Sequence, residues 1–307
     1  MLKSNSTAPT VVVTLVGGLG NQLFQYAMGR SLSFRNNQPL VLDLAWFDQV
    51  KNEAAGITTI REYALEPFNL PVRTQCVGLP RPKADGVIGR ILRRFIRTLP
   101  RHHIGHRIYA EPWFRFDAGV LALHGPVWLD GYWQSPKYFS DIAALLRKEL
   151  GQPGKVSLLT RDMLKEIGRY DAICLHVRRG DYVTNQNAAA IHGLCSPDYY
   201  ILGLSHVLGG LQNPHCFVFS DEPAWARSNL HLPVPTTVVD INSPAAAHED
   251  LWLMSACSRF VIANSSLSWW GGWLSNAPNK VVVAPKAWFA DGHIDTSDLI
   301  PTEWVRI

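Results

Sequence analysis

The stretch Ile173-Cys174-Leu175-His176-Val177-Arg178-Arg179-Gly180-Asp181-Tyr182 decides how the chain is interpreted. Its apolar start predicts a buried strand over residues 172–175, and a histidine, two arginines, a glycine and an aspartate follow at once. In open α/β sheets, ligands bind outside the carboxyl ends of the strands. Two neighbouring guanidiniums suit a diphosphate, because each offers a planar fork of N–H donors and keeps its charge. The stretch therefore predicts a site for a nucleotide-sugar diphosphate. The alternative is that Arg178 and Arg179 form surface ion pairs.

Composition indicates a folded protein with sizeable cores. The chain has 307 residues, which is enough for two domains, and 47% of them are hydrophobic while 18% are charged. These values exclude a mostly disordered chain. The net charge of +4 favours anionic ligands without requiring nucleic acid, which usually needs a strongly basic face. The eleven tryptophans are expected to line the core and, in part, a groove that binds sugars or bases.

Cysteine and histidine spacing predicts neither disulfides nor a metal site. No CxxC pair is present, and the five scattered cysteines are expected to be reduced, as in a cytoplasmic protein: Cys76, Cys174, Cys195, Cys216 and Cys257. His102, His103 and His106 come closest to a ligand set, but they lie in an arginine-rich run that would repel a cation. The apolar run over residues 11–16 is too short for a signal-sequence core or a membrane span.

The N-terminal half opens with a strand, a glycine loop and a helix. A β-branched strand over residues 11–15 leads through Gly17-Gly18-Leu19-Gly20-Asn21 into a predicted helix over residues 22–34, and a second strand follows over residues 39–44. Glycines at a helix start let backbone N–H groups reach a phosphate. However, the spacing fails GxGxxG because Leu23 stands three positions after Gly20, and no P-loop lysine is present. The alternative is a tight turn without a ligand.

The run over residues 81–107 is strongly basic, with a single acid, Asp85. At about 100° per residue, apolar side chains between Val87 and Leu99 cover one half of a helix, and arginines from Arg90 to Arg97 fall on the other. Such a helix suits an anionic membrane surface. The alternative is a helix that packs on its own domain and leaves a solvated positive face.

A break at Gly151-Gln152-Pro153-Gly154 predicts the domain boundary, which gives domains over residues 1–150 and 151–307. Before it, a strand begins at residue 127 and Ser140-Asp141 is expected to cap a helix over residues 142–150. Beyond it, strands over residues 172–175, 216–219, 238–240, 260–263 and 281–284 alternate with helices over residues 156–168, 197–208 and 247–257. This alternation predicts a parallel, doubly wound α/β sheet that the last strand closes. A mobile loop is expected over residues 185–195.

Three strand ends of the second half are expected to meet at one edge of the sheet. They are residues 176–181, residues 220–222 with Ser220 and Asp221, and residues 264–268 with Asn264, Ser265 and Ser266. Arginines and a helix start suit phosphates, and Asp221 suits the N–H donors of guanine or the hydroxyls of ribose. Ser265 and Ser266 are alternatively plain N-caps, and the two roles are compatible.

These segments resemble the motifs of the α-1,2-fucosyltransferases, glycosyltransferase family 11. The resemblance includes His176-Val177-Arg178-Arg179-Gly180-Asp181, Ser220-Asp221-Glu222, Asn264-Ser265-Ser266-Leu267-Ser268-Trp269-Trp270, the start from Gly17 to Tyr26, and Gly131-Tyr132-Trp133-Gln134-Ser135. It runs from residue 17 to about residue 285. It implies a GT-B fold of two Rossmann-like domains facing a cleft, with GDP-fucose in the C-terminal domain and the acceptor largely on the N-terminal one. It also implies inversion at the anomeric carbon and no required metal or other cofactor, which agrees with the absence of any Asp-x-Asp.

The charge that develops during sugar transfer suggests roles for residues in the second half of the chain, and the resemblance adds Gly20 and Asn21. Arg178 is the first choice to stabilise charge on the β-phosphate and Arg179 the second, and Gly20 and Asn21 are expected to reach the diphosphate or the fucose from the N-terminal domain. Asp181 or His176 is a candidate base for the acceptor hydroxyl, and the alternative is that both brace the arginines. The expected reaction moves L-fucose from GDP-fucose to the 2-hydroxyl of a terminal β-galactoside, in O-antigen or related glycan synthesis.

The expected location is the cytoplasm, with the basic helix holding the enzyme at the inner membrane beside a lipid-linked acceptor. Two other functions stay open from the residues. A nucleotide-dependent oxidoreductase would use an acid at the end of the second strand, where Asp43 stands, but gives the double arginine no role. A non-catalytic glycan-binding protein would use the tryptophans and would not bind a GDP-sugar.

Overall fold

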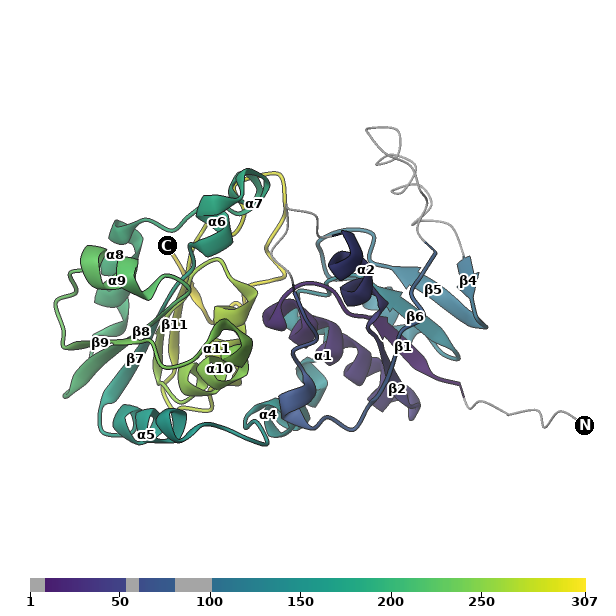
Figure 1. The fold of residues 1–307 in the computed structure, drawn as a ribbon, viewed down its shortest axis with the longest axis horizontal. Helices are drawn as coiled ribbons and strands as arrows, with labels where there is room; N and C mark the ends of the chain where they lie inside the picture. Colours follow the sequence, from purple (N-terminus) through teal and green to yellow (C-terminus); the bar gives the residue numbers. More distant parts are fainter. Residues whose placement is uncertain (1–8, 54–60, 81–100) are drawn as a thin grey trace, which may run out of the picture. The chain divides into compact units, whose positions relative to one another are not determined.

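The structure is a computed structural model that describes residues 9–53, 61–80 and 101–307, apart from the side chain of Asn187. The chain divides into two compact units (Figure 1). Unit 1 takes the residues up to 65, residues 70–144 and residues 297–299, and unit 2 takes residues 66–69, 145–296 and 300–307. The change of unit between Ala144 and Leu145 falls within helix α4 (Ala143–Leu150).

Unit 1 is built on a six-stranded sheet in the order β3-β2-β1-β6-β5-β4. Its neighbours run parallel except for the hairpin of β4 with β5. The strands are β1 (Val11–Thr14), β2 (Leu40–Asp43), β3 (Arg73–Gln75), β4 (Arg101–His103), β5 (His106–Ala110) and β6 (Val127–Asp130). The β-branched side chains of β1 explain its central place, since Val11, Val12 and Val13 are at most 1% exposed.

Helix α1 (Leu19–Asn36) begins directly after the glycine loop, with Gly18 as its N-cap. It is longer than expected at both ends, and Asn37 ends it in the left-handed conformation, with φ of 50°. The other helical segments of unit 1 are α2 (Ala45–Glu53), η2 (Ala118–Ala122), η3 (Pro136–Tyr138) and η4 (Ser140–Ile142). The helix expected over residues 142–150 is therefore preceded by a 3-10 turn at Ser140 rather than capped there.

Unit 2 contains a six-stranded, fully parallel sheet in the order β12-β11-β10-β7-β8-β9. The strands are β7 (Asp171–Val177), β8 (Pro214–Ser220), β9 (Thr236–Val239), β10 (Arg259–Val261), β11 (Val281–Ala284) and β12 (Val305–Arg306). The expected parallel, doubly wound sheet is confirmed. The expectation that residues 281–284 close it is wrong, because β12 pairs with β11 on its outer side.

The helices of unit 2 cover both faces of this sheet. They are α5 (Leu158–Ile167), α6 (Gly180–Thr184), α7 (Gln186–His192), α8 (Pro197–Val207), α9 (Pro223–Asn229), α10 (Ala247–Ser255) and α11 (Ser266–Leu274), with short 3-10 turns η1 (Glu66–Phe68) and η5 (Pro244–Ala246). Helices α8 and α9 lie on one side of the sheet and α10 and α11 on the other (Figure 1). Alternate residues of β7 explain the core on the α8 side, where Ile173, Leu175 and Val177 join Tyr200 and Leu204.

One expectation from the sequence is wrong, and another concerns residues that the structure does not describe. The loop expected over residues 185–195 contains helix α7, because its alanine triplet has a high helix propensity. In the basic run, residues 81–100 lie outside the described residues, and the rest begins the hairpin of β4 and β5. All five cysteines are free thiols. Within the described residues, every helix is either too short or too polar to span a lipid bilayer.

Candidate active site

Three neighbouring strands of unit 2 deliver the predicted residues to one edge of the sheet. Counted within the unit, the strand order is 3-2-1-4-5-6, so the direction of winding reverses at β7. The carboxyl end of β7 leads to Arg178, that of β8 to Asp221, and that of β10 to Asn264. In doubly wound sheets, this reversal opens a crevice outside the strand ends in which ligands bind.

Arg178 joins two of these segments. Its Nη1 lies 2.9 Å from Asp221 Oδ2, and its Nη2 donates to Asp181 Oδ1 at 2.6 Å. Burial lowers the pKa of Arg178, but the charges of Asp221 and Asp181 outweigh this effect, so that its pKa is raised overall. Arg178 is therefore a permanent cation held between two carboxylates.

Arg179 is fixed differently. Its Nε donates to Glu222 Oε2 at 3.0 Å, its backbone N–H donates to Asp221 Oδ1 at 2.9 Å, and its guanidinium carbon lies 3.9 Å from the centre of the Trp225 ring. Ser220 supports Glu222, because its Oγ accepts the Glu222 backbone N–H at 3.0 Å. The ring contact adds a cation–π interaction to the ion pair.

Gly180 makes the close approach of these segments possible. A Cβ atom at this position would stand 2.5 Å from Asp221 Oδ2 and 3.1 Å from its Cγ. Only a residue without a side chain lets the start of α6 lie this close to the Asp221 carboxylate.

Arg178 and Arg179 both form ion pairs, as the alternative prediction had it. These ion pairs also leave room for a ligand. The side chains of Arg178 and Arg179 are each 20% exposed, so these pairs are partly buried. A guanidinium has more N–H donors than the two that Arg178 uses in its ion pairs. The carboxylates thus orient a cation that still has donors for phosphate oxygens.

His176 and Asp181 relate to Arg178 in different ways. His176 lies within β7 and is 4% exposed, and its Nδ1 has no hydrogen-bond partner among the described residues. Burial, and then the charge of Arg178, lower the pKa of His176 to about 3, so the ring is neutral and weakly basic. Asp181 is bound to Arg178. The low pKa of His176 and the ion pair of Asp181 argue against either residue as the base, and the ion pair shows Asp181 bracing Arg178.

Ser265 and Ser266 stand at the start of α11, a few residues after the carboxyl end of β10. Ser265 is the N-cap residue, but its side chain makes no capping hydrogen bond, which contradicts plain N-capping. Ser265 is 8% exposed. Backbone N–H groups at a helix start are suited to anions.

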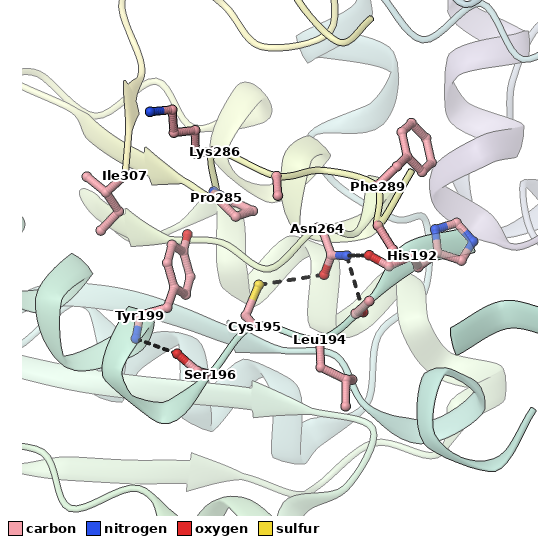
Figure 2. A pocket seen from close by; sticks show the side chains of 13 residues that line it. His192, Leu194, Cys195, Ser196, Tyr199, Asn264, Pro285, Lys286, Phe289 and Ile307 are labelled. Carbon is pink, nitrogen blue, oxygen red and sulfur yellow. Dashed lines mark hydrogen bonds between the residues drawn. The ribbon is translucent and has the colours of Figure 1, made fainter. Parts of the chain in front are cut away.

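Asn264 lies in the same segment, but its side chain points toward a pocket beside β10 and β11 (Figure 2). The pocket has a volume of about 430 Å³ and is lined mainly by the segments before α8 and after β11. The amide Nδ2 donates to the backbone oxygen of His192 at 2.7 Å, and Oδ1 accepts from Cys195 Sγ at 3.6 Å. Direct donor binding by this side chain, as expected from the sequence, is therefore disfavoured.

Gly20 and Asn21 belong to unit 1, at the start of α1. Asn21 Oδ1 accepts from Gln134 Nε2 at 2.8 Å, and Gln25 Nε2 donates to the Gly131 oxygen at 3.3 Å. The glycine loop and the segment from Gly131 to Ser135 are thus brought together, whereas neither is grouped with the arginines of unit 2.

Asp43 serves the backbone of unit 1. It is fully buried and accepts the N–H groups of Val77 at 2.9 Å and Gly78 at 3.1 Å. A carboxylate engaged in this way does not offer itself to a ribose, which removes the residue basis for the oxidoreductase alternative.

The sequence did not single out two aromatic partners of the arginines. Trp225 lies in α9 against Arg179, and Tyr182 lies in α6 with the Arg178 guanidinium carbon 5.4 Å from its ring centre. The available signal was an aromatic residue in the first helical turns after each charged segment.

Among the described residues, no cluster of three or more histidine, cysteine, aspartate or glutamate side chains could hold a metal ion.

The chain is built from two α/β units, and unit 2 has cations and a helix start at the reversal point of its sheet, which is where doubly wound folds commonly bind their ligands. The profile of glycosyl transferase family 11 matches residues 10–307. The chain belongs to this family, and the fold class that the resemblance implied, two α/β units with largely parallel sheets, is confirmed.

Three sequence relatives are consistent with this membership. An alpha-1,2-colitosyltransferase of Escherichia coli is 32% identical over 97% of this chain and 98% of its own. The O-antigen biosynthesis glycosyltransferase WbnK of the same species is 30% identical over 95% and 99%. A galactoside 2-alpha-L-fucosyltransferase of Caenorhabditis elegans is 32% identical over 50% and 44%. The solved NodZ alpha-1,6-fucosyltransferase soaked with GDP-fucose is 15% identical, with a TM-score of 0.47 over 87% and 92% of the chains.

Proposed function

We propose that the protein is an inverting, metal-independent glycosyltransferase that moves L-fucose from GDP-fucose to the 2-hydroxyl of a terminal β-galactoside. The observation that carries the proposal is Arg178, which is held by Asp221 and Asp181 at the reversal point of a parallel sheet. Family membership supplies the reaction class. The name of the relative WbnK supports a role in O-antigen synthesis.

The chemistry follows from where charge develops. As the bond between fucose and GDP stretches, negative charge grows on the β-phosphate while the sugar becomes oxocarbenium-like. A cation that is already oriented stabilises this charge without reorganisation during the reaction. Arg178 takes this role, with Arg179 and the start of α11 at Ser265 and Ser266 holding the remaining phosphate oxygens.

We propose that the guanine base of GDP-fucose binds at the carboxyl end of β8, beside Asp221. Asp221 receives one N–H at each oxygen from the two arginines. A carboxylate has about four lone-pair sites, so Asp221 can also accept from guanine. The Ser220 hydroxyl accepts the backbone N–H of Glu222 and thereby fixes the turn that carries Asp221.

A second donor is favoured by one specific relative, the alpha-1,2-colitosyltransferase. Colitose differs from fucose by the loss of the 3-hydroxyl. A site that hydrogen-bonds this hydroxyl would reject the analogue that lacks it by about 10⁴-fold or more, whereas an apolar site discriminates only weakly. Comparing kcat/KM for GDP-fucose and GDP-colitose therefore identifies the donor and the kind of contact.

The test combines binding and product analysis. Calorimetry with GDP should show a single site per chain, and NMR of products from a panel of β-galactosides should show a new α-1,2 linkage. A glycan-binding protein would bind galactosides but not GDP, and an oxidoreductase would change NAD(P)H absorbance instead. Absence of both GDP binding and transfer from either GDP-sugar would overturn the proposal.

We further propose peripheral contact with an anionic membrane through the basic segment from Arg90 to Arg97, where a lipid-linked acceptor would be present. Flotation with vesicles containing anionic lipid tests this. Replacing Arg93, Arg94 and Arg97 by glutamine should abolish co-flotation, and equal flotation of the variant and the parent would contradict the contact.

A further inference from the structure

We propose that Asn264 is a positioning residue for Arg178: it fixes Tyr182 and His192, which in turn set the place of the Arg178 guanidinium. This inference rests on the proposed function only in assigning the diphosphate to Arg178. It replaces the direct contact with the donor that the sequence suggested for Asn264.

The Asn264 side chain is committed to the protein. It is 3% exposed. Its Nδ2 donates to the backbone oxygens of His192 at 2.7 Å and Trp288 at 3.3 Å, and its Oδ1 accepts from Cys195 Sγ at 3.6 Å. Figure 2 shows the bonds to His192 and Cys195 meeting at this one amide. The side chain thus ties the end of α7 to the segment after β11.

The backbone of Asn264 makes a second connection. Its carbonyl oxygen accepts the Tyr182 hydroxyl at 3.3 Å, and Tyr182 is 9% exposed. The Tyr182 ring stacks on His192, with ring centres 4.5 Å apart and planes 6° from parallel. Asn264 therefore holds both members of the stack, one through its side chain and one through its backbone.

The stack reaches Arg178. The Arg178 guanidinium carbon lies 5.4 Å from the Tyr182 ring centre, within the range of a cation–π contact. The carboxylates of Asp181 and Asp221 fix two edges of the guanidinium, and the ring restrains it in a further direction. Because transition-state stabilisation depends on preorganised donors, a loose ring lowers turnover more than it lowers affinity for GDP.

An amide is needed for this role. Asn264 donates and accepts with the two ends of one planar group, which neither aspartate nor alanine does. In Asn264→Asp, a carboxylate oxygen would face the carbonyl oxygens of His192 and Trp288, and in Asn264→Ala those carbonyls would lose their donor.

The decisive experiment is a double-mutant cycle of Asn264→Ala with Arg178→Lys, measured as kcat and as Kd for GDP. If Asn264 acts through Arg178, Asn264→Ala alone lowers kcat about 10-fold or more, and adds less than about 2-fold in the Arg178→Lys background. Independent losses that multiply would overturn the inference. Tyr182→Phe removes only the hydroxyl that reaches the Asn264 carbonyl oxygen, a contact that Asn264→Ala keeps. It therefore tests the backbone connection separately and should lower kcat on its own, even if Asn264→Ala folds poorly.

A matched control separates positioning from general destabilisation. Asn242 also uses its amide internally in unit 2, since it donates to Asp250 at 2.8 Å and accepts from Thr160 at 3.1 Å. Asn242→Ala should lower thermal stability without coupling to Arg178→Lys. Equal coupling for both asparagines would overturn the inference.

Cys195 gives a readout that does not depend on activity. Burial raises the pKa of its thiol to about 11, so it reacts slowly with iodoacetamide. In a Cys76→Ser background, the other three cysteines are buried, so labelling reports Cys195. Asn264→Ala should accelerate this labelling, and an unchanged rate would count against the inference. If the parent protein neither binds GDP nor transfers sugar, the proposed function fails instead.

Discussion

Arg178 Nη1 and Asp221 Oδ2 lie 2.9 Å apart and join the carboxyl ends of β7 and β8. Each side chain is largely enclosed, at 20% and 24% exposure. Removing one partner of such a pair leaves a poorly solvated charge, so the pair defines the geometry of this edge.

Replacing Arg178 by lysine keeps the charge but removes the fork that reaches Asp221 and Asp181 together. We expect kcat for transfer to fall about 10²-fold or more, with a smaller change in KM for the acceptor. Steady-state kinetics measures this. Arg227→Lys is the matched control, because its pair with Asp240 is about half exposed and follows the edge strand β9 rather than the strands at the reversal point. Equal losses in both variants would contradict the role of Arg178.

Arg179→Lys should have a weaker effect. The change removes the Nε bond to Glu222 and the stacking on Trp225, but the backbone N–H of residue 179 still reaches Asp221. We expect roughly a 10-fold loss in kcat. A loss larger than that of Arg178→Lys would reverse the proposed order of the two arginines.

Gly180→Ala tests the close approach of α6 to β8. Its methyl group would meet Asp221 Oδ2 at 2.5 Å, so the carboxylate must move. Calorimetry should show GDP affinity reduced by about 10-fold, the equivalent of roughly 1.4 kcal/mol. Gly209→Ala is the control, since a methyl group there meets no atom within 4 Å and should leave affinity unchanged.

Asp250 gives a prediction for stability against pH. Burial, aided by Glu249 and Asp240, raises its pKa to about 6, although Asn242 donates to it. The folded state therefore binds more protons than the unfolded state between about pH 4 and pH 6, and stability falls as pH rises through this window.

Asp250→Asn should remove the loss of stability that the Asp250 carboxylate causes as pH rises. The melting temperature of the variant, compared with the parent, should rise by about 2 °C or more near pH 7.5 and by less near pH 4. Calorimetric scans at both pH values measure the difference. Asp162→Asn, at an exposed pair with Lys165, should show no such pH dependence. A gain that is larger at low pH would mean that the Asp250 pKa is not raised.

Metal removal should not affect transfer. The positive charge at the proposed phosphate site comes from Arg178 and Arg179, which cannot lose it. Activity after extensive dialysis against EDTA should equal activity with added Mg²⁺ or Mn²⁺. Loss of activity that is restored by one cation would show that the arginines do not suffice.

Much of unit 2 was predictable, because its strands are short apolar runs that end in charged or hydroxyl residues. The convergence of Arg178 and Asp221 followed from parallel strand ends alone. Family membership was predictable from the motifs that contain them.

What the sequence did not reveal depends on side-chain direction. Asn264 stands in a motif beside Ser265, and no periodicity shows that its amide turns toward His192 and Cys195. The short strand β12 was missed because two residues carry no pattern, and α7 was missed because a glycine and polar residues obscured its alanines.

The central position of β7 has a consequence for synthesis of the chain. Both of its neighbours, β8 and β10, emerge from the ribosome later, so one flank of β7 stays open until residue 261 has been made. Open strand flanks invite association between chains. Truncations that stop before β10 should therefore aggregate, even though the ion-pair partners of both arginines have already been made at that point.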